Sequence, residues 1–173
     1  MNKKILTSIT LWLLFFTGSA QCYYEKFEVK GGIAYSSRRT HMYERKRSLV
    51  SDVYLLFEKT LVTRFNPWRT SYTIVVDIDG RLGAEGFSIL RLTYYDDKII
   101  NLYLPHTDEV NVIGSSMGYE AYGDFEPHSP EVEGIANNSI KSAILINEDN
   151  KYITLDIPPA YFVDAFNCVK NLN

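Results

Sequence analysis

Residues Ser71–Pro105 read SYTIVVDIDGRLGAEGFSILRLTYYDDKIINLYLP and contain three apolar runs separated by turn-forming residues. From Tyr72 to Asp79 the side chains mostly alternate between two faces, which is the period of a β-strand. A turn dipeptide, Asp79-Gly80, ends this run, and Phe87–Tyr94 and Ile99–Leu104 predict two further strands. Because parallel neighbours need crossovers of about a dozen residues or more, we expect the three strands to be antiparallel neighbours.

Two hairpins and one helix are predicted around this stretch. Asp96-Asp97 is expected to form a two-residue hairpin loop. Ile140–Ile146 and Tyr152–Ile157 flank the polar residues Asn147–Asn150, which predicts a hairpin with a four-residue loop. Ala160–Leu172 then has the apolar periodicity of an amphipathic helix. The apolar residues of that helix are Phe162, Ala165, Phe166, Val169 and Leu172.

The rest of the chain adds shorter or ambiguous strands. Tyr24–Tyr35 reads as one strand broken by a bulge or bend at Gly31-Gly32. Leu49–Phe65 fits a helix or strands, and we favour two strands. Val110–Ile113 reads as a short strand. The sequence therefore predicts a single, mainly β domain over residues 21–173, an antiparallel β-sandwich or partly open barrel with one C-terminal α-helix.

The first 20 residues have the features of a secretory signal peptide. Lys3 and Lys4 precede the apolar run Ile5–Phe16, and the small residues Gly18 and Ala20 predict cleavage after Ala20. A membrane anchor is the alternative, but this run is shorter than the roughly 20 residues that span a bilayer. We expect a periplasmic or secreted protein without stable membrane insertion.

The two cysteines, Cys22 and Cys168, lie near the two ends of the expected mature chain. In an oxidising compartment such a pair is expected to form a disulfide. Lipidation of Cys22 is a second possibility, although Gln21 replaces the small residue that usually precedes a lipidated cysteine.

Charge argues against a general nucleic-acid-binding protein. The full chain has a net charge of −3, and loss of Lys3 and Lys4 with the leader makes it −5. One basic cluster stands out, and it is either a solvated loop or a patch for an acidic partner. Its residues are Arg38, Arg39, Arg45, Lys46 and Arg47.

The segment Gly114–Gly134 has little apolar periodicity and is predicted to be a long irregular loop. Long loops often carry function, and tyrosine is favoured at protein interfaces. We therefore expect this loop to be the main protein-contact surface, with a mobile loop lacking a partner as the alternative. The expected contact residues are Tyr119, Glu120, Tyr122, Asp124, Phe125, Glu126 and His128.

Catalytic and metal chemistry have weak signals. Gly114–Gly118 matches the G-x-S-x-G pattern of serine hydrolases, with Ser116 as nucleophile and His106 or His128 as base, but the helix that should follow is not predicted. The acidic residues of the same segment match no calcium-loop spacing. We expect no catalytic residue, no metal site and no cofactor.

The C-terminal segments SAILINEDNKYITLDIP and AYFVDAFNCVKNL, within residues 140–173, resemble the end of small periplasmic proteins of the invasion-associated locus B type. The resemblance implies a β-sandwich that ends in a strand, a short linker and a helix near a cysteine, and it implies no catalytic residue. The expected function is non-enzymatic binding of another protein, as an inhibitor or immunity-type factor. The alternatives are a serine hydrolase using Ser116 and a small-ligand carrier.

Overall fold

The computed structural model describes residues 22–38, 40–44, 50–64, 69–80, 86–111, 117–158 and 160–172. The expected signal peptide therefore lies outside the described residues. Within them, the chain forms two antiparallel sheets and two helices. The prediction of a mainly β, antiparallel fold with a C-terminal helix is confirmed.

The larger sheet has seven strands in the order β1-β2-β4-β5-β9-β8, and β3 pairs with part of β4. The smaller sheet has four strands in the order β11-β10-β6-β7. The strands of the larger sheet are β1 (Tyr24–Val29), β2 (Gly32–Ser37), β3 (Thr40–Glu44), β4 (Val50–Val62), β5 (Arg69–Gly80), β8 (His106–Asn111) and β9 (Met117–Phe125). The remaining elements are β6 (Phe87–Tyr94), β7 (Ile99–Tyr103), β10 (Ile140–Asn147), β11 (Tyr152–Leu155), α2 (Pro130–Asn137) and α3 (Tyr161–Lys170).

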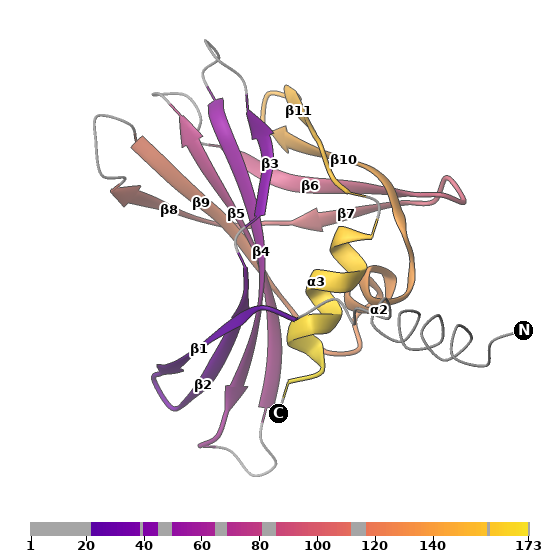
Figure 1. Cartoon of the computed structure of the whole chain (residues 1–173). Helices are drawn as coiled ribbons and strands as arrows, with labels where there is room; N and C mark the ends of the chain where they lie inside the picture. The colour runs from indigo at the N-terminus through magenta and orange to yellow at the C-terminus, as the bar shows by residue number, and fades with distance from the viewer. Residues whose placement is uncertain are drawn as a thin grey trace, which may run out of the picture.

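One face of the larger sheet is covered and the molecule has a single extended core. Figure 1 shows the smaller sheet crossing one half of the larger sheet, while α3 and α2 lie beside it against the other half. We call the covered side of the larger sheet its inner face and the opposite side its outer face. The Phe57 ring of β4 lies 5.4 Å from the Phe162 ring and 5.7 Å from the Phe166 ring of α3, centroid to centroid. These apolar contacts belong to one buried cluster that draws on both sheets and both helices.

All three strands predicted within Ser71–Pro105 form, but only two of them are neighbours. β6 and β7 pair as an antiparallel hairpin, whereas β5 pairs with β4 and β9. The chain passes from the larger to the smaller sheet after β5, so the prediction that β5 and β6 are neighbours is wrong. Both β5 and β6 bury apolar side chains in the shared core. Their apolar patterns would be the same whether the two strands paired in one sheet or lay in two sheets packed face to face.

Both predicted hairpins form, but each loop has three residues, so the predicted lengths of two and four residues are wrong. The Tyr94 amide donates to the Lys98 carbonyl at 2.9 Å, and the Asn147 amide donates to the Lys151 carbonyl at 3.0 Å. The third loop residue is left-handed in each case, Asp97 with φ 61° and Asn150 with φ 60°. Three-residue loops need such a residue, and Asp and Asn tolerate it.

Three further strand predictions need correction. Tyr24–Tyr35 forms two strands joined by a tight turn at Lys30-Gly31, where Gly31 has φ +85°. Leu49–Phe65 contains one continuous strand, β4, because alternate residues from Val53 to Leu61 stay buried without interruption. The strand predicted at Val110–Ile113 begins earlier, at His106, and is described only to Asn111.

The segment Gly114–Gly134 differs most from the prediction. Instead of an irregular loop, its described part contains the strand β9 and the start of the helix α2. β9 lies between β5 and β8, so this segment belongs to the framework of the larger sheet. Part of the segment, residues 114–116, lies outside the described residues.

The predicted disulfide between Cys22 and Cys168 is confirmed, with 5.3 Å between the two Cα atoms. It joins the residue two positions before β1 to the last turns of α3. The Tyr161 hydroxyl at the start of α3 donates to the Leu55 carbonyl of β4 at 3.0 Å. The C-terminal helix is therefore fastened to the larger sheet at both of its ends.

Candidate functional site

The strand β9 separates the predicted contact residues onto two faces. Tyr119 and Phe125 point to the inner face and pack against the core. Glu120, Tyr122 and Asp124 alternate with them and share the outer face. Glu126 and His128 follow the strand; the His128 side chain is 95% exposed and lies 4.0 Å from Glu133 of α2. The structure thus brings together three of the seven predicted residues.

Neighbouring strands extend this outer-face group into a composite surface. In the sheet register, Glu120 lies between Asp77 of β5 and Asp108 of β8, and Tyr122 lies between Val75 and His106. The surface is hollowed into a depression of about 310 Å³. The residues lining this outer-face depression are Leu56, Glu58, Thr73, Val75, Asp108, Glu120, Tyr122 and Asp124.

Tyr122 is the aromatic centre of the outer-face depression. Its ring stacks on the His106 ring, with 5.0 Å between centroids and 27° between planes. The Asp108 carboxylate accepts a hydrogen bond from the Tyr122 hydroxyl, and this bond is the main reason that the pKa of Tyr122 is raised. Thr73 donates through Oγ1 to Oδ1 of Asp124 at 2.5 Å. The polar side chains around Tyr122 are therefore held in place by bonds between strands.

The carboxyl groups of the depression lie close enough to oppose one another's ionisation. Burial is the largest cause of the raised pKa of Glu58, and Asp124 and Asp77 add to it, while a hydrogen bond from Ser36 opposes it. Burial also raises the pKa of Glu120, reinforced by Asp77, Asp108 and Glu58. Among the described residues, none of the ion pairs involves Glu58, Asp108 or Glu120. The depression is a concentrated negative surface.

The outer face is also the accessible side of the larger sheet. The smaller sheet, α2 and α3 all lie against the inner face (Figure 1). Over the outer face around Tyr122, the described part of the chain places no helix or second sheet. Asp108 and Asp124 are exposed and Glu120 and Tyr122 are half-buried, so these four side chains present accessible surface in the depression.

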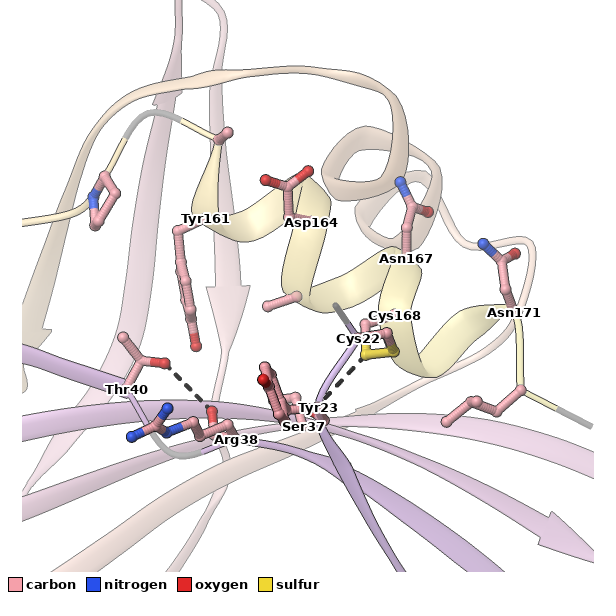
Figure 2. A pocket seen from close by; sticks show the side chains of 14 residues that line it. Cys22, Tyr23, Ser37, Arg38, Thr40, Tyr161, Asp164, Asn167, Cys168 and Asn171 are labelled. Atoms are coloured by element: carbon pink, nitrogen blue, oxygen red, sulfur yellow. Dashed lines mark hydrogen bonds between the residues drawn. A yellow bond between two sulfur atoms is a disulfide. The ribbon is translucent and has the colours of Figure 1, made fainter. Parts of the chain in front are cut away.

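A second hollow, of about 630 Å³, lies between α3 and the first strands. Figure 2 shows Asp164, Asn167 and Asn171 on the helix side and Tyr23, Arg38 and Thr40 opposite, with the Cys22–Cys168 disulfide between the helix and the strands. Arg38 is the only residue of the predicted basic cluster within the described ranges; Arg39, Arg45, Lys46 and Arg47 lie outside them.

The serine-hydrolase geometry finds no support in the elements that surround Ser116. Ser116 itself lies outside the described residues, but Met117 directly after it begins a strand. A nucleophile elbow needs a helix after the serine. His106 is stacked on Tyr122 and His128 is exposed beside Glu133.

The predicted contact residues Glu120, Tyr122 and Asp124 all line the outer-face depression, but sequence reasoning missed the residues that surround them there. Leu56, Glu58 and Val75 lie on β4 and β5, some 45 to 65 positions earlier in the chain. Only the pairing of β4 with β5 and of β5 with β9 brings them together. The alternation of polar and apolar residues in β5 was the one available signal, because it showed that this strand has an outer face.

Within the described ranges, no three His, Cys, Asp or Glu side chains are grouped so that they could hold a metal ion. The helices of the described part are all too short or too polar to cross a membrane. No family model, no curated protein and no solved structure matches this chain.

Proposed function

We propose that this protein is a secreted, non-enzymatic binding protein and that it contacts a protein partner with a basic surface through the outer-face depression. One observation carries the proposal. Tyr122 lies beside Val75 and shares the depression with Leu56 and with the carboxylates of Glu58, Asp108, Glu120 and Asp124, on a sheet face that no described helix or sheet covers.

The composition of the depression suits protein recognition. An aromatic side chain beside apolar neighbours can act as an anchor, and anchors of this kind commonly cost about 2 kcal/mol or more when truncated. The surrounding carboxylates would attract a basic surface and speed its association, and this attraction weakens as salt rises. A basic partner would also favour the ionised carboxylates, so binding should release protons.

The expected export of the protein supports an inhibitory or immunity-type role outside the cytoplasm. Residues 1–20 have the pattern of a signal peptide, and the Cys22–Cys168 disulfide is typical of oxidising compartments. A small acidic binding protein in such a compartment could block a basic toxin or enzyme by covering its surface.

Affinity capture from the periplasmic or secreted fraction tests the proposal, with the wild type compared with Tyr122→Ala. The wild type should retain a specific basic protein, and Tyr122→Ala should lose most of it while keeping the melting temperature of the wild type. Tyr152→Ala is the matched control, because Tyr152 is 67% exposed on the smaller sheet. If Tyr122→Ala and the wild type capture the same proteins, the outer-face depression is not the contact site.

A small-ligand carrier is the second candidate, because the hollow shown in Figure 2 has the volume of an ordinary ligand pocket. Native mass spectrometry of the folded protein purified from its own compartment would show a retained small molecule. Asp164→Ala, on the wall of the hollow, should reduce that occupancy, whereas Tyr122→Ala should not.

A further inference from the structure

The strand β1 forms one edge of the larger sheet and is unusually exposed. It pairs with β2 along its whole length, and in the described part of the chain no strand lies on its other side. Five of its six residues are exposed, including Phe27 at 40%. An exposed edge strand offers unpaired backbone groups to another chain.

The turn after β1 shows which backbone groups point to the open edge. Val29 and Gly32 close a two-residue loop, and the closing pair of such a hairpin exchanges hydrogen bonds. Consistently, the Gly31 carbonyl points away from β1 and accepts a hydrogen bond from the Thr63 amide at 3.0 Å. The Gly32 amide of the same peptide group therefore points towards β1. Because the pattern alternates, Lys26 and Glu28 direct their amide and carbonyl groups away from β2.

The side chains of β1 select one partner for this edge. If a second β1 lies antiparallel beside the first, with Lys26 opposite Glu28 of the partner subunit, the outward backbone groups of both residues are satisfied. The two-fold axis then passes midway between Phe27 and Phe27 of the partner subunit, which face each other in a non-hydrogen-bonded pair. A shift of this pairing by two residues would place Lys26 opposite Lys26, which is unfavourable.

We propose that β1 pairs with β1 of a second copy in this register and joins the two larger sheets into one continuous sheet. Two Lys26–Glu28 pairs lie on the inner-face side of the junction, and the Phe27 pair lies on the outer-face side. Neither Lys26 nor Glu28 forms an ion pair with any other described residue. The Lys26 ammonium lies 5.5 Å from the Tyr35 ring centroid, a contact that leaves the charge available.

Charge reversal tests the register directly. The mature wild type should show twice the mass of one chain by size-exclusion chromatography with light scattering. Lys26→Glu alone and Glu28→Lys alone should each give monomers, because each places like charges in both pairs. An equimolar mixture of the two variants should restore the dimer, as should the double variant Lys26→Glu/Glu28→Lys. A wild type that stays monomeric up to its solubility limit, or single variants that stay dimeric, would overturn the proposal.

Cross-linking gives a second readout that does not depend on charge. Phe27→Cys should form an intermolecular disulfide on mild oxidation, because facing residues of a non-hydrogen-bonded pair lie within disulfide range. Glu25→Cys is the control, since residue 25 faces position 29 of the partner subunit and not its own equivalent. Peptide mapping should show the Cys22–Cys168 bond intact in both variants. Equal cross-linking of the two variants would contradict the register.

Discussion

Lys59 is a lysine buried between β4 and α3, with 6% of its surface exposed. Its ammonium donates to the Lys170 carbonyl at 2.9 Å and also to the Leu172 carbonyl. Lys170 is the last residue of α3 and Leu172 follows two positions later, so both carbonyls lie at the C-terminal end of the helix, where backbone acceptors lack helical partners and the helix dipole is negative. Burial lowers the pKa of Lys59, and the two carbonyls offset part of the cost of burying its charge.

Lys59→Met should therefore destabilise the protein even though methionine fits a buried position. The change leaves the carbonyls of Lys170 and Leu172 without their donor, which costs about 1–3 kcal/mol in the free energy of unfolding. Urea unfolding measures this loss, and hydrogen exchange should show earlier opening of the last turn of α3. Lys98→Met at an exposed position is the control and should change stability by less than about 0.5 kcal/mol. If Lys59→Met and the wild type are equally stable, the hydrogen bonds of Lys59 to the end of α3 contribute nothing to stability.

Glu120 in the outer-face depression makes the stability of the protein depend on pH. Its pKa is raised in the folded protein, first by burial and then by Asp77, Asp108 and Glu58. A raised folded pKa means that the folded state holds the proton more tightly than the unfolded state. The resulting stabilisation of the folded state is fully present at a pH below 4.5, the pKa of the unfolded state. It is lost as the pH rises through the higher pKa of the folded state.

Glu120→Gln should reduce the dependence of folding stability on pH. At neutral pH the variant should melt on the order of 2 °C above the wild type, because it removes one of several mutually repelling charges. Near pH 4 the two proteins should melt at nearly the same temperature. Thermal melts across this range measure the difference, and Glu148→Gln at an exposed hairpin loop is the control. A gap between Glu120→Gln and the wild type that grows on acidification would contradict this assignment of the pKa shift.

At the scale of elements, prediction succeeded where the apolar period was strong. β6, with buried Phe87, Leu90, Leu92 and Tyr94, and the C-terminal helix were both found from their patterns. The strand β9 was missed because its inner-face positions include Ala121 and Gly123, which give little apolar alternation. The helix α2 was missed although it has a readable start: Ser129 caps it and Pro130 follows.

Gly123 is small because the smaller sheet crosses the larger one at this point. A Cβ atom at position 123 would lie 2.3 Å from the Tyr103 carbonyl oxygen at the end of β7. Gly123→Ala should therefore push the two sheets apart and lower the free energy of unfolding by about 1–3 kcal/mol. Chemical unfolding measures this loss. Glu126→Ala, at an exposed position just after β9, is the control and should stay within about 0.5 kcal/mol of the wild type. Unchanged stability of Gly123→Ala would mean that the sheets are less tightly apposed at this crossing.

At the scale of the whole molecule, the limit on prediction was the order of strands in the sheets. The sequence predicts that β5 is a strand with two faces, but it does not show that β9 lies beside it. A strand-to-strand connection can equally make a hairpin or pass to the opposite sheet, since both outcomes bury the same apolar side chains. The outer-face depression is built from four strands, so its composition could not be predicted before the topology was known.

The Cys22–Cys168 disulfide was predictable, because the expected signal peptide and an even pair of cysteines were enough to indicate it. It closes a loop of 146 residues, nearly the whole expected mature chain. In the chain-entropy model a loop of this length contributes about 4–5 kcal/mol, mainly by restricting the unfolded state.

The double variant Cys22→Ser/Cys168→Ser tests this contribution. It should melt on the order of 10 °C below the wild type while retaining the same sheets by circular dichroism. The helix α3 should stay docked in the variant, because Phe162 and Phe166 pack on Phe57 and the Tyr161 hydroxyl bonds to the Leu55 carbonyl independently of the disulfide. Native-state hydrogen exchange should accordingly show local opening confined to residues 22–24, with α3 protected up to the lowered global stability. If α3 instead exchanges freely while the sheets remain protected, the disulfide holds the helix in the folded state and its effect is not mainly on the unfolded chain.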